Sequence, residues 1–385
     1  MRKISADYIF PVSSPPIKNG VVMVDDNGKI LKVISSKTEG AEKFSGIIVP
    51  GFVNTHCHLE LSHLKGKISE RKGLAGFISE LIPKRGSFSP EEIKSAIESA
   101  EKEMISNGIV AVGDISNTEH SFEKKKKENV FYHTFIEIFD LIPEKAEEKI
   151  SEAKNLISKL KSPSSSITPH APYSVSVKLM ERIDNLRQPF LSIHNQESSL
   201  ENELFSSGTG PLAELMQKAG VDVDSKRRVQ NSLLYILGGL METKKVLLVH
   251  NTYTSQEDLE LIKHYSNDCE INFCLCPKAN LFIENTLPDI PMLVQSGIKI
   301  TIGTDSLASN DSLSILEEMK TIQKHFPKIS FEMLLQWSTK NGAEFFGIEK
   351  EFGTIEKGKK PGLNLLKGMN EKFELSEKVS VQKII

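Results

Sequence analysis

A His-x-His pair stands at the end of an apolar run near the start of the chain. The sequence GIIVPGFVNTHCH places His56 and His58 two positions apart, in a chain with only ten histidines. If the run is a β-strand, residues two apart point to the same side of it, so both imidazoles can face one point. The pair can therefore supply two nitrogen ligands to a single metal ion.

Further side chains that can bind metals or transfer protons follow other apolar runs. They are His170 in SSITPHAPYS, His194 and Glu197 in PFLSIHNQES, His250 in KVLLVHNTY and Asp305 in KITIGTDS. One histidine at a strand end is more often a hydrogen-bonded structural residue than a ligand. Several such groups at the same end of different strands are harder to explain in that way, and they indicate one shared site.

The residue types in this set fit the activation of water. Imidazole nitrogens plus one carboxylate, with one coordination position left open, describe a catalytic zinc or iron site. A carboxylate that is not a ligand, Glu197, can shuttle a proton, and His250 can polarise the group under attack. The runs VFYHTFIEIFD and SSITPHAPYS contain no lysine that could be carbamylated to bridge two metals. We therefore expect a single metal ion.

The elements that must position these side chains are eight predicted strands. They are IIVPGFVNTHCH, GIVAVGDIS, VFYHTFIEIFD, SSITPHAPYS, PFLSIHNQES, KVLLVHNTY, EINFCLCP and KITIGTDS. Helical stretches lie between them; one of these should begin at Ser89 and Pro90 and end before Gly108. Eight such β–α units predict an α/β fold of the (β/α)8 TIM-barrel type, whose active site lies at the carboxyl ends of the strands.

The two ends of the chain differ from the middle in the predicted secondary structure. Residues 1–49 hold short β-like pieces separated by the turn signals KNG and DNG, and a β-like segment returns in FGTIEKGKKPGLNLL. We expect residues 1–49 plus 349–385 to form a small β-sandwich domain and residues 50–348 to form the catalytic barrel.

Composition narrows the range of partners. The 48 Lys and Arg residues nearly balance the 51 Asp and Glu residues, so the charge does not favour nucleic acid or an anionic membrane. The chain shows no apolar segment of signal-peptide type and no run long enough to span a bilayer. Four cysteines are few for this length, which suits a reducing compartment. These features predict a cytoplasmic protein without membrane or nucleic-acid partners.

Five motifs give the chain a resemblance to a known family. PGFVNTHCHLELS, HNQES, LVHNTY, CPKAN and IGTDSLASN occur in this order, and GTIEKGKKPGLNLL follows as a return to the small sheet. This ordered set resembles the amidohydrolase superfamily, and within it the mononuclear branch of deaminases and chlorohydrolases. The resemblance covers nearly the whole chain.

The resemblance implies a role for each matching residue. The implied metal ligands are His56, His58, His194 and Asp305, and the implied catalytic residues are Glu197, His250 and Asp305. His170 looks like a substrate-contacting residue, and Glu60 and His63 on the loop after the first barrel strand are candidate substrate-binding residues. The implied cofactor is one divalent metal ion, zinc or iron, with zinc favoured. Relatives are often homodimers.

The reaction that the resemblance implies is hydrolytic deamination of a purine nucleoside-type substrate. The sequence motif HCHLELSHLKG is most similar to the corresponding motif of the aminodeoxyfutalosine deaminases of menaquinone biosynthesis. The substrate of those enzymes is an adenine nucleoside derivative with a benzoate group. A benzoate would need a cation, for which Lys65, Lys67, Arg71 and Arg85 are available. The alternatives are deamination of S-adenosylhomocysteine, methylthioadenosine, guanine or a triazine-like ring, and a barrel scaffold without catalysis.

Overall fold

Eight parallel strands form the centre of the molecule in two four-stranded sheets. The computed structural model describes residues 1–36, 39–127, 129–160, 162, 164–218, 220–221, 229–265 and 269–385. The first sheet has the order β6 (Phe52–Cys57), β7 (Ile109–Ser116), β8 (Phe131–Ile138) and β9 (Ser165–Pro169). The second has the order β10 (Leu191–Asn195), β11 (Lys245–His250), β12 (Glu270–Leu275) and β13 (Lys299–Ile302). Each of the eight predicted strands is present, which confirms an α/β fold.

The two sheets meet at both of their edges. At one junction the backbone N–H of His194 in β10 donates to the carbonyl oxygen of His170, just after β9, at 3.0 Å. At the other, the N–H of Thr304, just after β13, donates to the carbonyl oxygen of His56 in β6, also at 3.0 Å. The carboxyl ends of strands from both sheets are thereby brought together.

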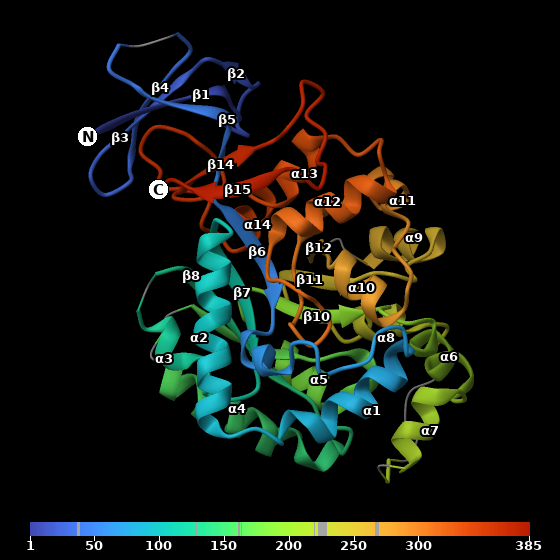
Figure 1. Ribbon diagram of the computed structural model, residues 1–385. Coiled ribbons are helices and arrows are strands. Elements are labelled where there is room, and N and C mark those ends of the chain that lie inside the picture. Colours follow the sequence, from blue (N-terminus) through green and yellow to red (C-terminus); the bar gives the residue numbers. More distant parts are fainter. Residues whose placement is uncertain are drawn as a thin grey trace.

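Helices alternate with the parallel strands and lie around them in Figure 1. The α-helices are α1 (Gly73–Arg85), α2 (Pro90–Ser106), α3 (Phe122–Lys125), α4 (Ala146–Leu160), α5 (Val177–Asp184), α6 (Ser199–Ser207), α7 (Pro211–Lys218), α8 (Ser232–Leu237), α9 (Gln256–Tyr265), α10 (Pro277–Ile283), α11 (Ile290–Gln295), α12 (Ile315–His325), α13 (Phe331–Trp337) and α14 (Lys340–Phe345). Among the described residues, short 3₁₀ turns are η1 (Leu59–Leu64), η2 (Pro143–Lys145) and η3 (Pro172–Ser174). No helix in the described part of the chain is both long and apolar enough to cross a membrane.

Helix α2 shows how local sequence sets an element's ends. The Ser89 side chain accepts a hydrogen bond from the backbone N–H of Glu92, and the Glu92 side chain accepts one in return from the N–H of Ser89. Pro90 occupies the first turn, where its missing N–H costs nothing. Gly108 follows the helix with φ of 78°, a left-handed conformation that glycine adopts readily. The predicted beginning and end of this helix are confirmed.

A third sheet joins the two ends of the chain. Its strands are β1 (Arg2–Ile9), β2 (Ile17–Lys18), β3 (Val21–Val24), β4 (Ile30–Ile34), β5 (Glu42–Pro50), β14 (Leu363–Lys367) and β15 (Ser380–Lys383). The order is β15-β14-β5-β1-β3-β4, with β2 paired to β1, and β14 runs antiparallel to β5. Figure 1 shows this sheet beside the parallel strands, with both termini in it. The division into domains at residues 49 and 349, and a sandwich form for the smaller one, stay predictions.

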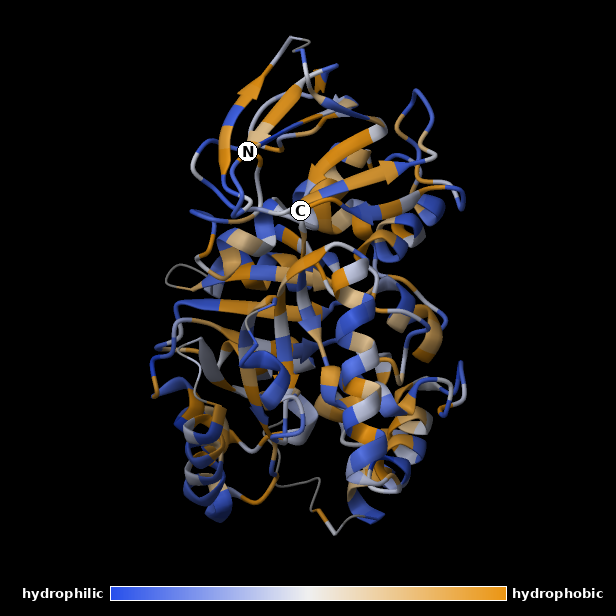
Figure 2. Cartoon of the chain, turned by 60° about the vertical axis from the view of Figure 1, so that its left-hand side comes forward, coloured by the Kyte–Doolittle hydropathy of each residue, from blue (hydrophilic) through white to orange (hydrophobic). Residues whose placement is uncertain are grey.

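The parallel strands are buried along almost their whole length. Every residue of β6, β7 and β10 is buried, as expected when both faces of a parallel sheet are covered. In Figure 2 hydrophobic residues run through the strands, while the helices carry many hydrophilic residues. Polar groups at the carboxyl ends of these strands are therefore held by a rigid and largely apolar framework.

Candidate metal centre and active site

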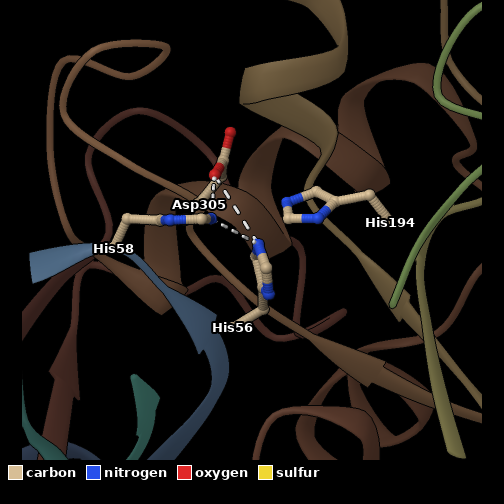
Figure 3. Close-up of side chains that lie close together, drawn as sticks. All are labelled: His56, His58, His194 and Asp305. Atoms are coloured by element: carbon tan, nitrogen blue, oxygen red, sulfur yellow. Dashed lines mark hydrogen bonds and ion pairs between the residues drawn. The ribbon is translucent and has the colours of Figure 1, made fainter. Parts of the chain in front are cut away.

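The four predicted ligands come together in one buried cluster. His56 lies in β6, His58 directly after it, His194 in β10 and Asp305 shortly after β13. One ligand atom from each of them lies within 4.8 Å of all the others. The Nε2 atoms of His56 and His58 are 3.1 Å apart, and Asp305 Oδ1 lies 3.7 Å and 3.5 Å from them (Figure 3).

Local backbone features place these side chains. The N–H of Leu59 donates to Asp114 Oδ1 at 2.9 Å, which fixes the turn that follows His58. Asp305 adopts φ of 57°, so the chain turns sharply after β13. A side chain at Gly303 would approach the Cβ of His56 to 2.8 Å, so only glycine allows the two segments to lie this close.

Hydrogen bonds orient two of the four ligands toward the centre of the cluster. His194 donates its Nδ1–H to the carbonyl oxygen of His170 at 2.8 Å, which leaves Nε2 free to bind a metal. Ser309 donates its hydroxyl to Asp305 Oδ2 at 2.5 Å, while Oδ1 faces the histidine pair. Partners of this kind fix the tautomer and orientation of metal ligands.

The chemistry of the cluster fits a divalent cation. Burial lowers the pKa of His58 well below its ordinary value, and burial together with the neighbouring His170 and His56 lowers that of His194 to about 4. Burial alone would raise the pKa of Asp305, but His56, His58 and His250 hold it well below its ordinary value. Burial also favours the neutral form of His56, but the hydrogen bond and charge of Asp305 outweigh it and raise the pKa of His56 above its ordinary value. Neutral His58 and His194 and an ionised Asp305 are the forms that a metal requires, and a bound cation would displace the proton of His56.

Glu197 and His250 lie beside this cluster. Glu197 follows β10, and its Oε1 is 3.5 Å from Nε2 of His250 at the end of β11. Burial raises the pKa of Glu197 well above its ordinary value, and the carboxylates of Asp305 and Glu201 raise it further. This shift favours the protonated form of Glu197, which suits a group that gives up a proton during the reaction.

The partners of His250 define its role as a donor. Asn280 Nδ2 lies 3.3 Å from His250 Nδ1 and also donates to Thr252 Oγ1 at 2.7 Å. With Asn280 as the donor, His250 Nδ1 accepts and Nε2 carries the hydrogen. That Nε2 is buried and has no hydrogen-bond partner among the described residues. It is available to a bound substrate.

A cavity of about 410 Å³ gives access to these groups. It is lined by His58, His194, Glu197, His250 and Asp305, and also by His170, Asn117, Glu137 and Arg85. Apolar side chains of α1 form another wall, comprising Leu74, Phe77, Ile78, Leu81 and Ile82. Its volume and its mixture of apolar walls with a few polar groups are typical of small-molecule sites.

The three predicted substrate-binding residues do not all lie in this cavity. His170 lines it, and its Nδ1 lies 2.8 Å from Ser174 Oγ. Glu60 and His63 instead line a neighbouring cavity of about 420 Å³. Glu60 is buried there, forms an ion pair with Arg85 and accepts three hydrogen bonds from Asn117 and Thr118. The structure thus places Glu60 behind Arg85 rather than in contact with the space beside the ligand cluster.

Sequence reasoning missed Asn117, Glu137 and Ser309. The available signal for Glu137 was an acidic residue inside the apolar strand VFYHTFIEIFD, close to its carboxyl end. Asn117 directly follows β7, and Ser309 lies in the segment after Asp305. Serine and asparagine are common in loops, so their types alone carried no signal of a site.

Replacing Ser309 by alanine is expected to weaken metal binding by about tenfold to 100-fold, because the Asp305 carboxylate loses the hydrogen bond on Oδ2. Competition with a chelating dye would measure the affinity. Ser99→Ala, at an exposed position of α2, serves as the matched control. An unchanged metal affinity in Ser309→Ala would show that Ser309 does not orient the Asp305 carboxylate for metal binding.

Comparisons with known proteins add an independent finding. Residues 47–385 match the amidohydrolase family. A protein named adenosine deaminase from Helicobacter pylori is 27% identical over 341 residues, which cover 86% of this chain and 80% of that protein.

Two solved structures share the fold. Aminofutalosine deaminase of Helicobacter pylori in complex with methylthio-coformycin aligns over 100% of both chains, with a TM-score of 0.82 and 23% identity. An adenosine deaminase from Xanthomonas campestris with bound zinc aligns over 94% of this chain and 84% of its own, with a TM-score of 0.70 and 21% identity.

Proposed function

The chain belongs to the amidohydrolase family, and we propose that this hydrolytic deaminase acts on aminodeoxyfutalosine, an adenine nucleoside derivative of menaquinone biosynthesis. The observation that carries the proposal is the buried cluster of three histidines and Asp305, with Glu197 and His250 beside it in one cavity. The curated relative named adenosine deaminase supports an adenine nucleoside as the substrate class.

The chain's own residues provide the proton transfers of a deamination. A divalent cation, when bound, supplies the Lewis acidity that makes water nucleophilic near neutral pH. Asp305 accepts a proton from the attacking water, and Glu197 gives its proton to the ring nitrogen beside the carbon under attack. His250 donates a hydrogen bond from Nε2 to the oxygen that is added. Asp305 passes the proton that it accepted to the amino group, which leaves as ammonia, and Glu197 takes the remaining proton from the added oxygen, so that a carbonyl remains on the ring.

Zinc is the metal that we assign to this site, as a single ion. Three imidazole nitrogens and a carboxylate are ligands that zinc accepts, although iron accepts them too. A second cluster, Glu137 with His170 and His194, shares one ligand with the first. Because His194 Nδ1 already donates to the carbonyl oxygen of His170, it has no lone pair for a second ion. This hydrogen bond supports one metal rather than two.

The wall formed by α1 supports a substrate with an extended apolar substituent. Its five apolar side chains face the cavity, and at its end stands Arg85, the one Lys or Arg among the cavity-lining residues that the structure describes. A benzoate needs both an apolar surface and a cation. Arg85 already forms an ion pair with Glu60 and donates to Asn117 Oδ1 at 3.0 Å, which holds its guanidinium in place.

A panel of substrates tests the proposal. Metal-loaded enzyme is mixed with aminodeoxyfutalosine, S-adenosylhomocysteine, methylthioadenosine, adenosine and guanine, and the absorbance change of each deamination is followed. We expect the highest kcat/KM with aminodeoxyfutalosine. A higher kcat/KM with another adenine nucleoside would agree with the proposed deamination mechanism but would contradict a role in menaquinone biosynthesis. Activity on none of them, from protein with full metal content, would favour a non-purine substrate or a scaffold.

We also propose a two-domain architecture for the enzyme. The hydrogen bonds at both sheet junctions support closure of the eight strands into one (β/α)8 barrel over residues 50–348. The joint sheet of the two chain ends supports a small β-sandwich domain of residues 1–49 plus 349–385. A cytoplasmic location and a homodimer stay predictions.

A further inference from the structure

Glu137 is a buried carboxyl group with one oxygen left without a partner. It lies in β8, its side chain is 3% exposed, and it lines the cavity beside the ligand cluster. Its Oε2 accepts a hydrogen bond from Asn117 Nδ2 at 3.0 Å. Its Oε1 has no hydrogen-bond partner among the described residues. A buried acceptor that is left unpaired is costly, so a bound molecule that supplies a donor gains affinity there.

A chain of hydrogen bonds fixes the position of this carboxyl group. Asn117 donates from Nδ2 to both Oε2 and the carbonyl oxygen of Glu137, and it accepts from Arg85 on its own Oδ1. Arg85 in turn forms an ion pair with buried Glu60. The free Oε1 is therefore held rigidly at the cavity wall, as a preorganised recognition group should be.

The contacts of Oε1 place it near the reacting end of the cavity. It lies 3.7 Å from Nδ1 of His194, whose hydrogen is already donated to the carbonyl oxygen of His170. Glu137 therefore does not hydrogen-bond His194. A group that binds Oε1 must be a donor on the part of the substrate close to the purine ring.

An adenine nucleoside has few donors that could serve. The base carries hydrogen-bond donors only on the amino group, which the reaction expels, and the remaining donors are hydroxyl groups of the ribose. We propose that Glu137 recognises the ribose, with Oε1 accepting a hydrogen bond from its 2′- or 3′-hydroxyl. This inference rests on the proposed function, and it assigns Glu137 as a specificity-determining residue that favours ribonucleosides over deoxyribonucleosides and free bases.

The test combines changes in the enzyme and in the substrate. Values of kcat/KM are measured for wild-type enzyme and Glu137→Gln with adenosine, 2′-deoxyadenosine and 3′-deoxyadenosine. In wild-type enzyme, loss of the recognised hydroxyl should lower kcat/KM by about tenfold to 100-fold. Glu137→Gln should lower kcat/KM for adenosine by a similar factor and should no longer distinguish adenosine from that deoxy analogue. Asn117 donates to the Oε2 position and so holds the amide oxygen of glutamine there, which puts the NH2 group, a donor, where the accepting Oε1 stood.

Controls separate this role from a structural one. Glu152→Gln, at an exposed position of α4, is the matched control and should behave like wild-type enzyme. Metal content and Tm are measured for every variant, and Glu137→Ala is carried through the same tests. If the Glu137 variants lose the same factor in kcat/KM on all three nucleosides, or contain less metal, the proposal is overturned, and Glu137 instead supports the position of His194. If wild-type enzyme deaminates no adenine nucleoside, the proposed function itself fails, and the ribose role fails with it.

Discussion

Replacing Glu197 by glutamine will lower kcat for deamination by about 10²-fold to 10⁴-fold and leave the metal content unchanged. Glutamine keeps the size of the side chain but cannot deliver a proton to the ring nitrogen. Glu197 is suited to that task because it is buried, its pKa is raised, and it lies 3.5 Å from His250 beside the ligand cluster. Steady-state kinetics on the best substrate of the panel would measure the effect, with metal analysis of the same preparations.

The control for this prediction lies on the next helix. Glu203 is exposed on α6, so Glu203→Gln changes the same chemical group away from the cavity and should keep wild-type kcat. Binding of a nucleoside inhibitor to Glu197→Gln should persist, since the site keeps its shape. A Glu197→Gln enzyme with more than a tenth of wild-type kcat would contradict the role of Glu197 as the proton carrier.

Much of the candidate site follows from local sequence because strand geometry dictates it. His56 in β6 and His58 just beyond it face one point through the two-residue period of a strand, and the order of parallel strands brings His194 and Asp305 to the same end. The residue types then limit the chemistry to a cation that accepts nitrogen and oxygen. Strand geometry alone did not separate these four positions from His170 and His250, which also stand at strand ends; their assignment as ligands came from the resemblance to the amidohydrolase superfamily.

The remainder of the site depends on contacts between distant segments. Glu60 looked like a cavity residue because it stands on the loop after β6, yet Arg85 of α1 and the backbone beyond β7 hold it behind the wall. Glu137 becomes notable only because Asn117, which comes from another strand end, binds one of its oxygens and leaves the other free. Side-chain partners of this kind are set by packing, and sequence periodicity contains no record of them.

A similar limit applies to the fold. The strands and the ends of α2 follow from apolar runs and capping residues, which act within a few positions of each other. The pairing of β14 with β5 joins Leu363 to Pro50 across more than three hundred residues, and its register depends on the finished structure. The sequence motif at the tail indicated a return to the small sheet but not which strand it would join.

Removal of the metal is expected to abolish activity and to destabilise the fold together. Chelation should reduce kcat by at least about 100-fold, since the attacking water loses its activation, and one equivalent of zinc should restore it. Without a cation, the cluster holds two imidazole nitrogens 3.1 Å apart beside the buried Asp305 carboxylate. An ion at 1,000 times its Kd would stabilise the folded state by about 4 kcal/mol, so Tm should rise measurably on adding zinc.

Ligand variants make the prediction specific to this cluster. His58→Ala should lower both zinc content and activity, whereas His264→Ala, at an exposed position on α9, should change neither. Loss of activity in His58→Ala with full zinc content would mean that the ion is held elsewhere. Full activity in protein shown to be metal-free would exclude metal-assisted hydrolysis altogether, because Glu197 and His250 can move protons but cannot by themselves make water a strong nucleophile at neutral pH. The joint response of zinc content, Tm and kcat therefore tests whether binding and catalysis occur at the same four residues.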